Sequence, residues 1–359
     1  MPAAILRMTP ALYRADSSGR IVQDISDYVT SGSVTWDLTR DIPMTLSARL
    51  RERGIVAPYA DYLIPRLQID YADGTSVASN LGLFTASLPK VTLTPTQGIE
   101  DIDGRDLTWR LAVDAVTTAT SYASGANIVS TVGGIIGTVT SRSALPASSA
   151  TLPEARSYEA GTSKLRIVND LLQAAGYYPI YADKDGYLRS MAYRTLANVQ
   201  PAVTYRAPAT GNVRVLRTVD LEPIEDALAN RIVVIRDAAT DTAYSKVITN
   251  TNPASPTSTV ALGATITKVV RNGRLASNAA ADALAKRLAE EASTFLYRIK
   301  LQTTPDPARS PHEVYALDIR NDAGAVVADG SWWCTAWTIG FTPDAAVMTH
   351  TLNRLVTYE

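Results

Sequence analysis

The chain has 359 residues, enough for two or three domains with a substantial hydrophobic core. Hydrophobic residues make up 46% of it and charged residues 19%, which is an ordinary globular balance. The formal net charge of −1 excludes a strong overall attraction to nucleic acid or to acidic lipid.

A single cysteine, Cys334, excludes an intrachain disulfide and a thiolate metal site. It stands among Trp332, Trp333 and Trp337, so we expect it to pack as a small apolar side chain. Residues 1–14 lack the apolar run of a signal peptide, and no stretch approaches the roughly 18–20 apolar residues that span a bilayer. We therefore expect a protein made in the cytoplasm, with no membrane segment.

Alternation of apolar and polar residues predicts strands through most of the first hundred residues. The clearest patterns cover residues 33–39, 44–50 and 66–71, with shorter ones at 81–87 and 90–94. Ser18-Gly19 and Asp73-Gly74 are turn signals between them. Short strands with frequent turns favour a barrel or a sandwich.

Helical spacing appears next, at residues 104–116 and 128–139, followed by a loop over residues 140–157. Residues 162–190 then predict a compact helix–hairpin unit. Thr162 or Ser163 can cap its helix and Gly176 can end it. Two short strands, 177–181 and 187–191, would be joined by a tight turn at Asp183-Lys184-Asp185-Gly186.

A second β-rich region begins near Tyr205. A continuous apolar strand is predicted at residues 232–235, and the clearest helix of the chain at 277–296, with Ser277 as its cap. The remaining strands are predicted at residues 297–302, 314–320, 332–341 and 346–356. Two β-rich regions separated by an α/β insertion suggest a duplicated architecture.

Carboxylates offer the first candidate chemistry. On a strand, Asp101 and Asp103 would point to one face, as acid–base catalysis or a hard cation requires. The alternative is a solvated turn entering a helix, with Asp106 at the helix start. Asp183-x-Asp185-Gly186 resembles half of a calcium loop, but lacks the later glutamate ligand, so a hairpin turn is favoured.

Histidines, tryptophans and arginines offer further candidates. His312 and His350 lie near no nucleophile motif, so surface or structural roles are expected. The run Trp332–Trp337 could form a sugar-stacking platform, with Trp333 and Trp337 on one strand face, or could be buried. Arg49, Arg51 and Arg53 alternate at a strand end, where they could line a channel or face solvent.

An ordered set of patterns along the chain resembles the tail-hub (baseplate-hub) proteins of tailed phages, the minor tail proteins of the tail tip. The patterns are a Trp-bearing strand, the stretch Pro58–Pro65 (PYADYLIP), the turn Asp73-Gly74, the run Leu81–Phe84 (LGLF), the helix start Asp106-Leu107, the helix ending AAGY with its hairpin, the strand Trp332–Ile339, and the strand Met348–Val356. Together these patterns span nearly the whole chain.

This resemblance implies a mainly β fold with α+β insertions. It would comprise two tail-tube-like β-barrel domains and a small α/β domain. The expected divisions are a first barrel at 1–115, the α/β domain at 116–205, and a second barrel at 206–359 that carries a helix-containing insertion at about 236–311.

The resemblance also implies a structural role in the virion, at the tail tip. Three subunits would form a homotrimeric ring that joins the tail tube to a central fibre or spike. Its expected partners are the distal tail protein, the tail tube, the tape-measure protein and the fibre or spike. DNA would pass through the lumen without specific binding, and no membrane partner is expected.

We expect no enzymatic activity, no catalytic, cofactor-binding or metal-binding residues, and no cofactor. The chain ends soon after the second β-region, so a fused cell-wall-cleaving domain is not expected. Two alternatives remain open at this stage. One is a receptor- or carbohydrate-binding tail protein that uses the Trp332–Trp337 run, and the other is a cell-wall hydrolase that uses Asp101 and Asp103.

Overall fold

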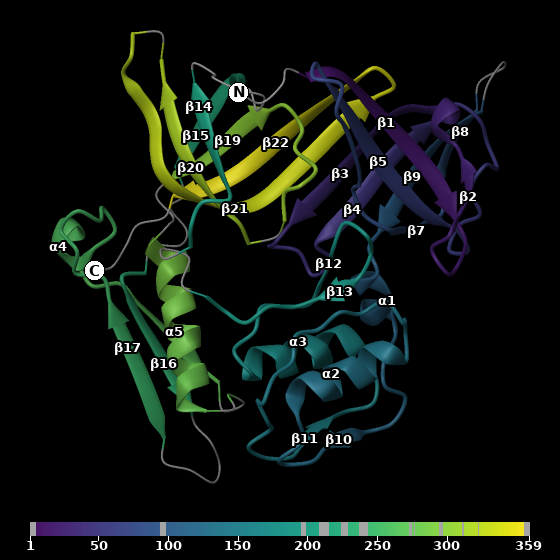
Figure 1. Cartoon of the computed structure of the whole chain (residues 1–359). Coiled ribbons are helices and arrows are strands. Elements are labelled where there is room, and N and C mark those ends of the chain that lie inside the picture. The colour runs from purple at the N-terminus through teal and green to yellow at the C-terminus, as the bar shows by residue number, and fades with distance from the viewer. Residues whose placement is uncertain are drawn as a thin grey trace.

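A computed structural model describes most of the chain. The described residues are 5–93, 98–194, 199–207, 215–223, 229–236, 243–272, 275, 277–293, 297–310, 312–321 and 323–354. The fold is mainly β, and its strands gather in one large mixed sheet, with two smaller α/β units beneath it (Figure 1).

The first β-unit occupies the N-terminal part of the chain. Its strands are β1 (Ile5–Ala15), β2 (Ile21–Asp24), β3 (Val29–Asp37), β4 (Met44–Leu50), β5 (Tyr62–Tyr71), β6 (Ser76–Asn80), β7 (Phe84–Ala86), β8 (Lys90–Leu93) and β9 (Gly98–Arg105), with the 3₁₀ turn η1 (Ser26–Tyr28). Alternation explains the strands: on β4, Met44, Leu46, Ala48 and Leu50 are all buried, and the residues between them are not.

The second β-unit comes from two stretches nearer the C-terminus. Its strands are β14 (Val203–Ala207), β15 (Val215–Pro223), β19 (Tyr297–Thr303), β20 (Val314–Arg320), β21 (Val326–Thr342) and β22 (Ala345–Arg354). Strands β14 and β20 are parallel, whereas the other pairs of this unit are antiparallel. Residues 355–356 of the last predicted strand lie outside the described residues.

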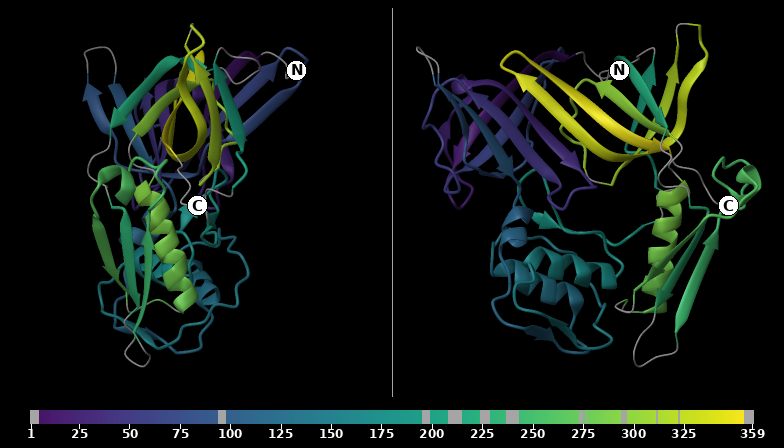
Figure 2. Two further views of the ribbon diagram at one scale, coloured as in Figure 1. Left: turned by 90° about the vertical axis from the view of Figure 1, so that its left-hand side faces the viewer. Right: turned by 180° about the vertical axis from the view of Figure 1, so that it is seen from behind.

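The two β-units share a sheet and a core, because β21 pairs antiparallel with β3. Trp36 lies opposite Trp337 in this ladder and stacks on it at 6.4 Å between ring centroids. Beside them, the hydroxyls of Thr35 and Thr338 are 3.0 Å apart. The apolar side chains of both units form one continuous core, so the two units are fused edge to edge (Figure 2).

The α/β insertion lies beneath the first β-unit (Figure 1). It contains α1 (Thr108–Val113), β10 (Thr120–Tyr122), α2 (Ile128–Gly137), β11 (Arg156–Tyr158), α3 (Lys164–Ala174), β12 (Tyr181–Ala182) and β13 (Leu188–Arg189). Ser163 caps α3 by accepting from the amide of Arg166, and Gly176 follows that helix with φ +76°. The predicted helix–hairpin unit is therefore confirmed, although its strands are shorter than predicted.

A second insertion lies beneath the second β-unit and separates β15 from β19. It contains β16 (Arg231–Arg236), β17 (Tyr244–Thr249), α4 (Thr259–Leu262), β18 (Thr267–Arg271) and α5 (Asn278–Ser293). The three strands form their own small sheet in the order β17-β16-β18, and α5 packs on it through an apolar face. Ser277 caps α5, as predicted, because its hydroxyl accepts from the amide of Ala280.

The expected mainly β fold with α/β insertions is confirmed. The expected pair of barrels is not, because the described strands join in one open path, β15-β19-β22-β21-β3-β4-β9-β7-β5-β1-β2, with no closed ladder among them. The expected domain divisions stay a prediction. Among the helices described here, none is long and apolar enough to cross a membrane.

Candidate functional site at the junction of the units

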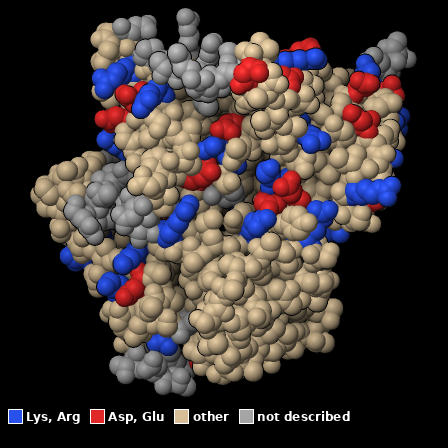
Figure 3. All heavy atoms as spheres, in the orientation of Figure 1, with Lys and Arg blue, Asp and Glu red and all other residues tan. Residues whose placement is uncertain are grey.

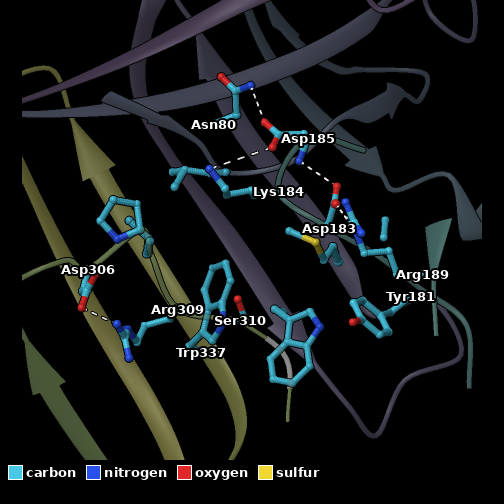
Figure 4. A pocket seen from close by; sticks show the side chains of 16 residues that line it. Asn80, Tyr181, Asp183, Lys184, Asp185, Arg189, Asp306, Arg309, Ser310 and Trp337 are labelled. Carbon is cyan, nitrogen blue, oxygen red and sulfur yellow. Dashed lines mark hydrogen bonds and ion pairs between the residues drawn. The ribbon is translucent and has the colours of Figure 1, made fainter. Parts of the chain in front are cut away.

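A cavity of about 250 Å³ lies where the α/β insertion meets both β-units (Figure 4). One wall is the β12–β13 hairpin, and the opposite wall is the segment Asp306–Ser310. Trp36, Trp337 and Ile339 line it from the fused sheet. Since this is where three parts of the molecule meet, it is the first place to look for chemistry.

The hairpin wall is held by its own aspartates. Asp183 accepts hydrogen bonds from the amides of Asp185 and Tyr187, at 3.0 and 2.8 Å, and forms an ion pair with Arg189. Asp185 accepts from the side-chain amide of Asn80, which ties the hairpin to the first β-unit. The carboxylates thus stabilise a turn and a contact between units, and the preference for a hairpin over a calcium loop is confirmed.

Gly186 explains why this turn sits so close to the sheet. Its φ of +79° is one that a side chain disfavours, and a Cβ at this position would lie 2.5 Å from Cβ of Leu83. Leu83 is buried next to Phe84 on the first β-unit. The glycine therefore permits both the tight turn and the close approach of the hairpin.

On the opposite wall, too, the charged side chains form ion pairs with one another. The Arg309 guanidinium lies 3.0 Å from a carboxylate oxygen of Asp306 and 3.3 Å from one of Glu313. Both carboxylates are mostly shielded, and burial raises the pKa of Glu313. The charged groups on both walls thus have protein partners, which favours a structural joint over a catalytic centre.

His312 lies at the same junction, deep inside the protein. Its ring stacks on Tyr178 at 3.9 Å between centroids and meets Trp36 and Tyr181 edge-on. Burial, reinforced by the nearby positive Arg194 and Arg287, lowers its pKa to about 3. The predicted surface or structural role is therefore structural: a neutral ring joins the α/β insertion to the sheet.

His350 is a second buried neutral ring, on β22 within the central core. Its Nε2 is 2.9 Å from the hydroxyl oxygen of Thr303 and 3.4 Å from that of Tyr205. Burial lowers its pKa to about 3 as well. The two histidines have no acidic partner among their described contacts. The Thr303 and Tyr205 hydroxyls beside His350 are themselves fully buried, out of reach of a substrate. The two histidines form no catalytic pair.

The tryptophan run is buried, and the predicted assignment of its faces is wrong. The β21–β22 ladder shifts by one residue between Cys334 and Ala336, so Trp332, Cys334 and Trp337 all join the central core. Trp333 instead packs with Val314 in a separate small cluster. Each of the three indoles is at most 8% exposed, so these residues present no stacking platform for a sugar.

Cys334 packs as the predicted small apolar side chain. It is fully buried, and burial raises the pKa of its thiol to about 12. A thiol with so little thiolate and no access to solvent is inert towards oxidants and electrophiles.

The candidate carboxylates do share a face, on β9, so the alternative of a solvated turn is wrong for them. Asp101 is held by Arg49, whose Nε donates to it at 2.6 Å, and this hydrogen bond lowers the pKa of the carboxyl. Asp103 is exposed, and its backbone oxygen accepts from Ser87. An ionised Asp101 paired with Arg49 is a poor general acid.

Asp106 was predicted near a helix start, and it binds the first residue of α1 from inside the protein. Its carboxylate accepts from the amides of Met44 and Thr108, both at 2.7 Å, and from the hydroxyl of Thr108. Burial raises its pKa to about 6. The side chain thus links β4 of the first β-unit to the beginning of the α/β insertion.

The three arginines of the strand end differ in environment. Arg49 is the partner of Asp101, whereas Arg51 and Arg53 follow β4 and are exposed. Among the described residues, no group of three or more histidine, cysteine or acidic side chains could hold a metal ion.

A nearly uncharged surface distinguishes the α/β insertion. Figure 3 shows its face almost free of lysine, arginine, aspartate and glutamate, in contrast to the mixed charges over the sheet. The sequence explains this, since Arg142 is the only charged residue between Asp114 and Glu154.

Known structures share this architecture. The structure of a tail protein from Neisseria meningitidis MC58 matches with a TM-score of 0.68 and 10% sequence identity, over 96% of this chain and 97% of that one. The prophage MuSo2 43 kDa tail protein from Shewanella oneidensis matches with a TM-score of 0.65 and 10% identity, over 97% and 98% of the two chains. The chain has the fold of phage tail proteins.

A more distant likeness extends the fold beyond phages. A component of the E. coli type VI secretion system, described as structurally similar to the T4 bacteriophage tail proteins gp27 and gp5, matches with a TM-score of 0.51 and 10% identity. The match covers 92% of this chain and 74% of the secretion-system component. No protein-family model and no curated protein matches the sequence.

The patterns behind the predicted resemblance lie at structural positions of this tail-protein fold. Asp61 holds the turn before β5, where its carboxylate accepts from the amide of Ala57 at 2.7 Å. Gly82 has φ +143°, and a Cβ there would meet the ring of Phe84 at 2.5 Å. Asp106 joins β4 to the start of α1, as described above. These residues shape turns and packing, so they account for the resemblance at the level of the fold.

Proposed function

We propose that the chain is a structural hub of a phage tail tip or of a related injection machine. Three copies would form a ring in which six tube-like β-units surround a channel. The observation that carries this proposal is the tail-protein fold, which extends over nearly the whole chain and includes two fused β-units.

The proposed ring would join the tail tube to a central fibre or spike. The distal tail protein and the end of the tape-measure protein would be its neighbours, and DNA would pass through the lumen without specific recognition. A net charge of −1 is compatible with that passage, because it provides no overall attraction for the phosphate backbone. Exposed Arg51 and Arg53 are candidates for the channel wall.

We further propose that the protein is not an enzyme. In support, Asp101 is bound to Arg49, both histidines are buried and neutral, and the tryptophan run belongs to the core. These environments remove the basis for both the hydrolase and the sugar-binding alternatives at the residues that suggested them.

Light scattering coupled to size exclusion tests the proposal directly. Purified protein at high concentration is expected to give three times the mass of one chain. A mass of one or two chains at every concentration tested would overturn the self-assembling trimer.

A further inference from the structure

The two β-units repeat one strand order. In the second unit the order is β15-β19-β22-β21-β20-β14. In the first unit it is β3-β4-β9, then the broken strand β8/β7/β6, then β5-β1. The single long strand β21, which pairs with β20 through its first half and with β22 through its second, thus corresponds to three short strands in the first unit.

Irregularities in the ladders fix which residues correspond. The β3–β4 ladder shifts register just after the pair Val29–Leu50, and the β15–β19 ladder shifts just after Val215–Thr303. Leu50 therefore corresponds to Thr303. In the first unit, Leu50 pairs with Glu100, and Glu100 pairs with Val91. In the second unit, Thr303 pairs with Met348, and Met348 pairs with Ile339.

An independent landmark supports this alignment, in which Val91 corresponds to Ile339 and Leu93 to Phe341. The β21–β22 ladder shifts by one residue between Cys334 and Ala336. The first unit has the same one-residue shift at the corresponding place, between the pairs Ala86–Gly104 and Lys90–Asp101. The two units therefore agree in strand order, and the irregularity that was not used to align them falls at the same place in both. They differ at one edge, where β1 is antiparallel to β5 but β14 is parallel to β20.

The corresponding edges differ in one respect. The second half of β21 pairs with β22 on one side and with β3 on the other. Its residues Ile339 and Phe341 are buried, at 0% and 6% exposure. On β8 the corresponding Val91 and Leu93 are 39% and 67% exposed, because β8 pairs only with β9 among the described strands. Likewise β15, the counterpart of β3, pairs only with β19 in the described sheet.

We propose that β8 of one copy pairs antiparallel with β15 of the next copy, as β21 pairs with β3 within each chain. This inference rests on the proposed ring and specifies its contact. The intrachain register, Ile339 opposite Val34 and Thr338 opposite Thr35, carries over to Val91 opposite Leu221 and Lys90 opposite Glu222. In place of the Thr35–Thr338 hydrogen bond, Lys90 would lie opposite Glu222 and join the ion pair that Glu222 forms with Lys300 of its own chain. Opposite charges at directly opposed positions favour this register.

This contact accounts for the exposed apolar residues of β8 without any further partner. Each copy carries one β8 edge and one β15 edge, so the contact is head-to-tail and successive copies can close into a ring. Pairing would also cover two unpaired sheet edges that otherwise expose backbone donors and acceptors.

Cysteine cross-linking tests the register. Lys90→Cys chains are mixed with Glu222→Cys chains and oxidised, and covalent dimers are expected, since directly opposite residues lie within disulfide reach. The matched control replaces Lys90→Cys with Val91→Cys, whose side chain lies on the other face of β8, and should give little product. Cys334 is fully buried and does not compete.

Light scattering of the same mixtures separates the two proposals. Oligomers that do not cross-link at this pair would overturn the β8–β15 contact and leave the ring standing. Monomers without cross-links would overturn both. Cross-linked dimers from the Lys90–Glu222 pair, with little from the control pair, would support both.

Charge exchange provides a second test without cysteines. Lys90→Glu places like charges opposite each other and is expected to weaken assembly by about threefold to tenfold per contact. Adding Glu222→Lys together with Lys300→Glu, which reverses the intrachain ion pair of these two residues without breaking it, should restore assembly. The exposed Val113→Asp, away from both edges at the end of α1, should have no effect. Equal weakening by Lys90→Glu alone and by the combined exchange at positions 90, 222 and 300 would contradict the pairing.

Discussion

Acidification should destabilise this protein through its two buried histidines. Burial lowers the pKa of His312 and of His350 from the ordinary value of 6.5 to about 3. Between these two pH values the histidines are therefore protonated in the unfolded chain and neutral in the folded one. Stability is retained above pH 6.5 and is lost as the pH falls below it.

The size of the effect follows from proton linkage. Each pH unit below 6.5 costs about 1.4 kcal/mol per histidine, so lowering the pH to 5 costs about 2 kcal/mol for each ring, or about 4 for both. Asp106 acts in the opposite direction. Burial raises its pKa to about 6, so the folded state gains stability as the pH falls through 6, by roughly 1 kcal/mol at pH 5.

Urea denaturation at pH 7 and pH 5 measures the change in the free energy of unfolding, to which these three groups contribute a loss of about 3 kcal/mol. Burial also raises the pKa of Glu313 and of Glu291, which offsets part of that loss. His312→Asn and His350→Gln should each remove about 2 kcal/mol of that loss. Asn suits position 312 because the backbone there has φ +60°, which Asn tolerates better than most residues. If both variants lose as much stability as the parent chain between the two pH values, the reasoning from burial is refuted.

Three other substitutions test individual statements. Trp337→Ala should lower the free energy of unfolding by about 3–5 kcal/mol in urea denaturation, because the indole is part of the core; a loss under about 1 kcal/mol would show that it is not packed there. Asp101→Asn should lower the free energy of unfolding by at most about 1 kcal/mol, since its ion pair with Arg49 is near the surface. Zymograms on cell-wall substrate should show no activity for the parent chain or the variant; activity that the substitution abolishes would restore the hydrolase alternative. Gly186→Ala should lower the melting temperature more than Gly125→Ala does. Both glycines have φ +79°, but only at position 186 would a Cβ meet Leu83. Equal decreases in melting temperature would contradict the close approach of the hairpin.

Local signals predicted the local structure well. Capping residues and helical spacing placed α3 after Ser163 and α5 after Ser277, because a helix is specified by contacts within a few residues. The β4 strand was predicted with its observed bounds, since one of its faces is buried. The hairpin after Asp183 followed from its turn residues.

Long-range features were not available from those signals. The pairing of β3 with β21 joins Thr35 to Thr338, which are 303 residues apart in the sequence. The register shift before Ala336 has no local signature, and it moved Trp337 to a face other than the one that simple alternation predicts. The same applies to His312, which lies in a polar stretch of sequence but is buried by aromatic residues from other elements.

The candidate site shows the same division. The sequence contains no motif that combines a nucleophile, a base and an orienting group. It could not show that Asp101 would be bound by Arg49 from the neighbouring strand, or that Asp106 would be buried between β4 and α1. These pairings depend on strand order, which the fold as a whole determines.

Electron microscopy of the purified assembly tests the central claim most directly. Class averages are expected to show a closed ring of three copies with six β-units around a central hole. Averages that show isolated chains, open chains of subunits, or a compact oligomer without a hole would contradict the proposed hub.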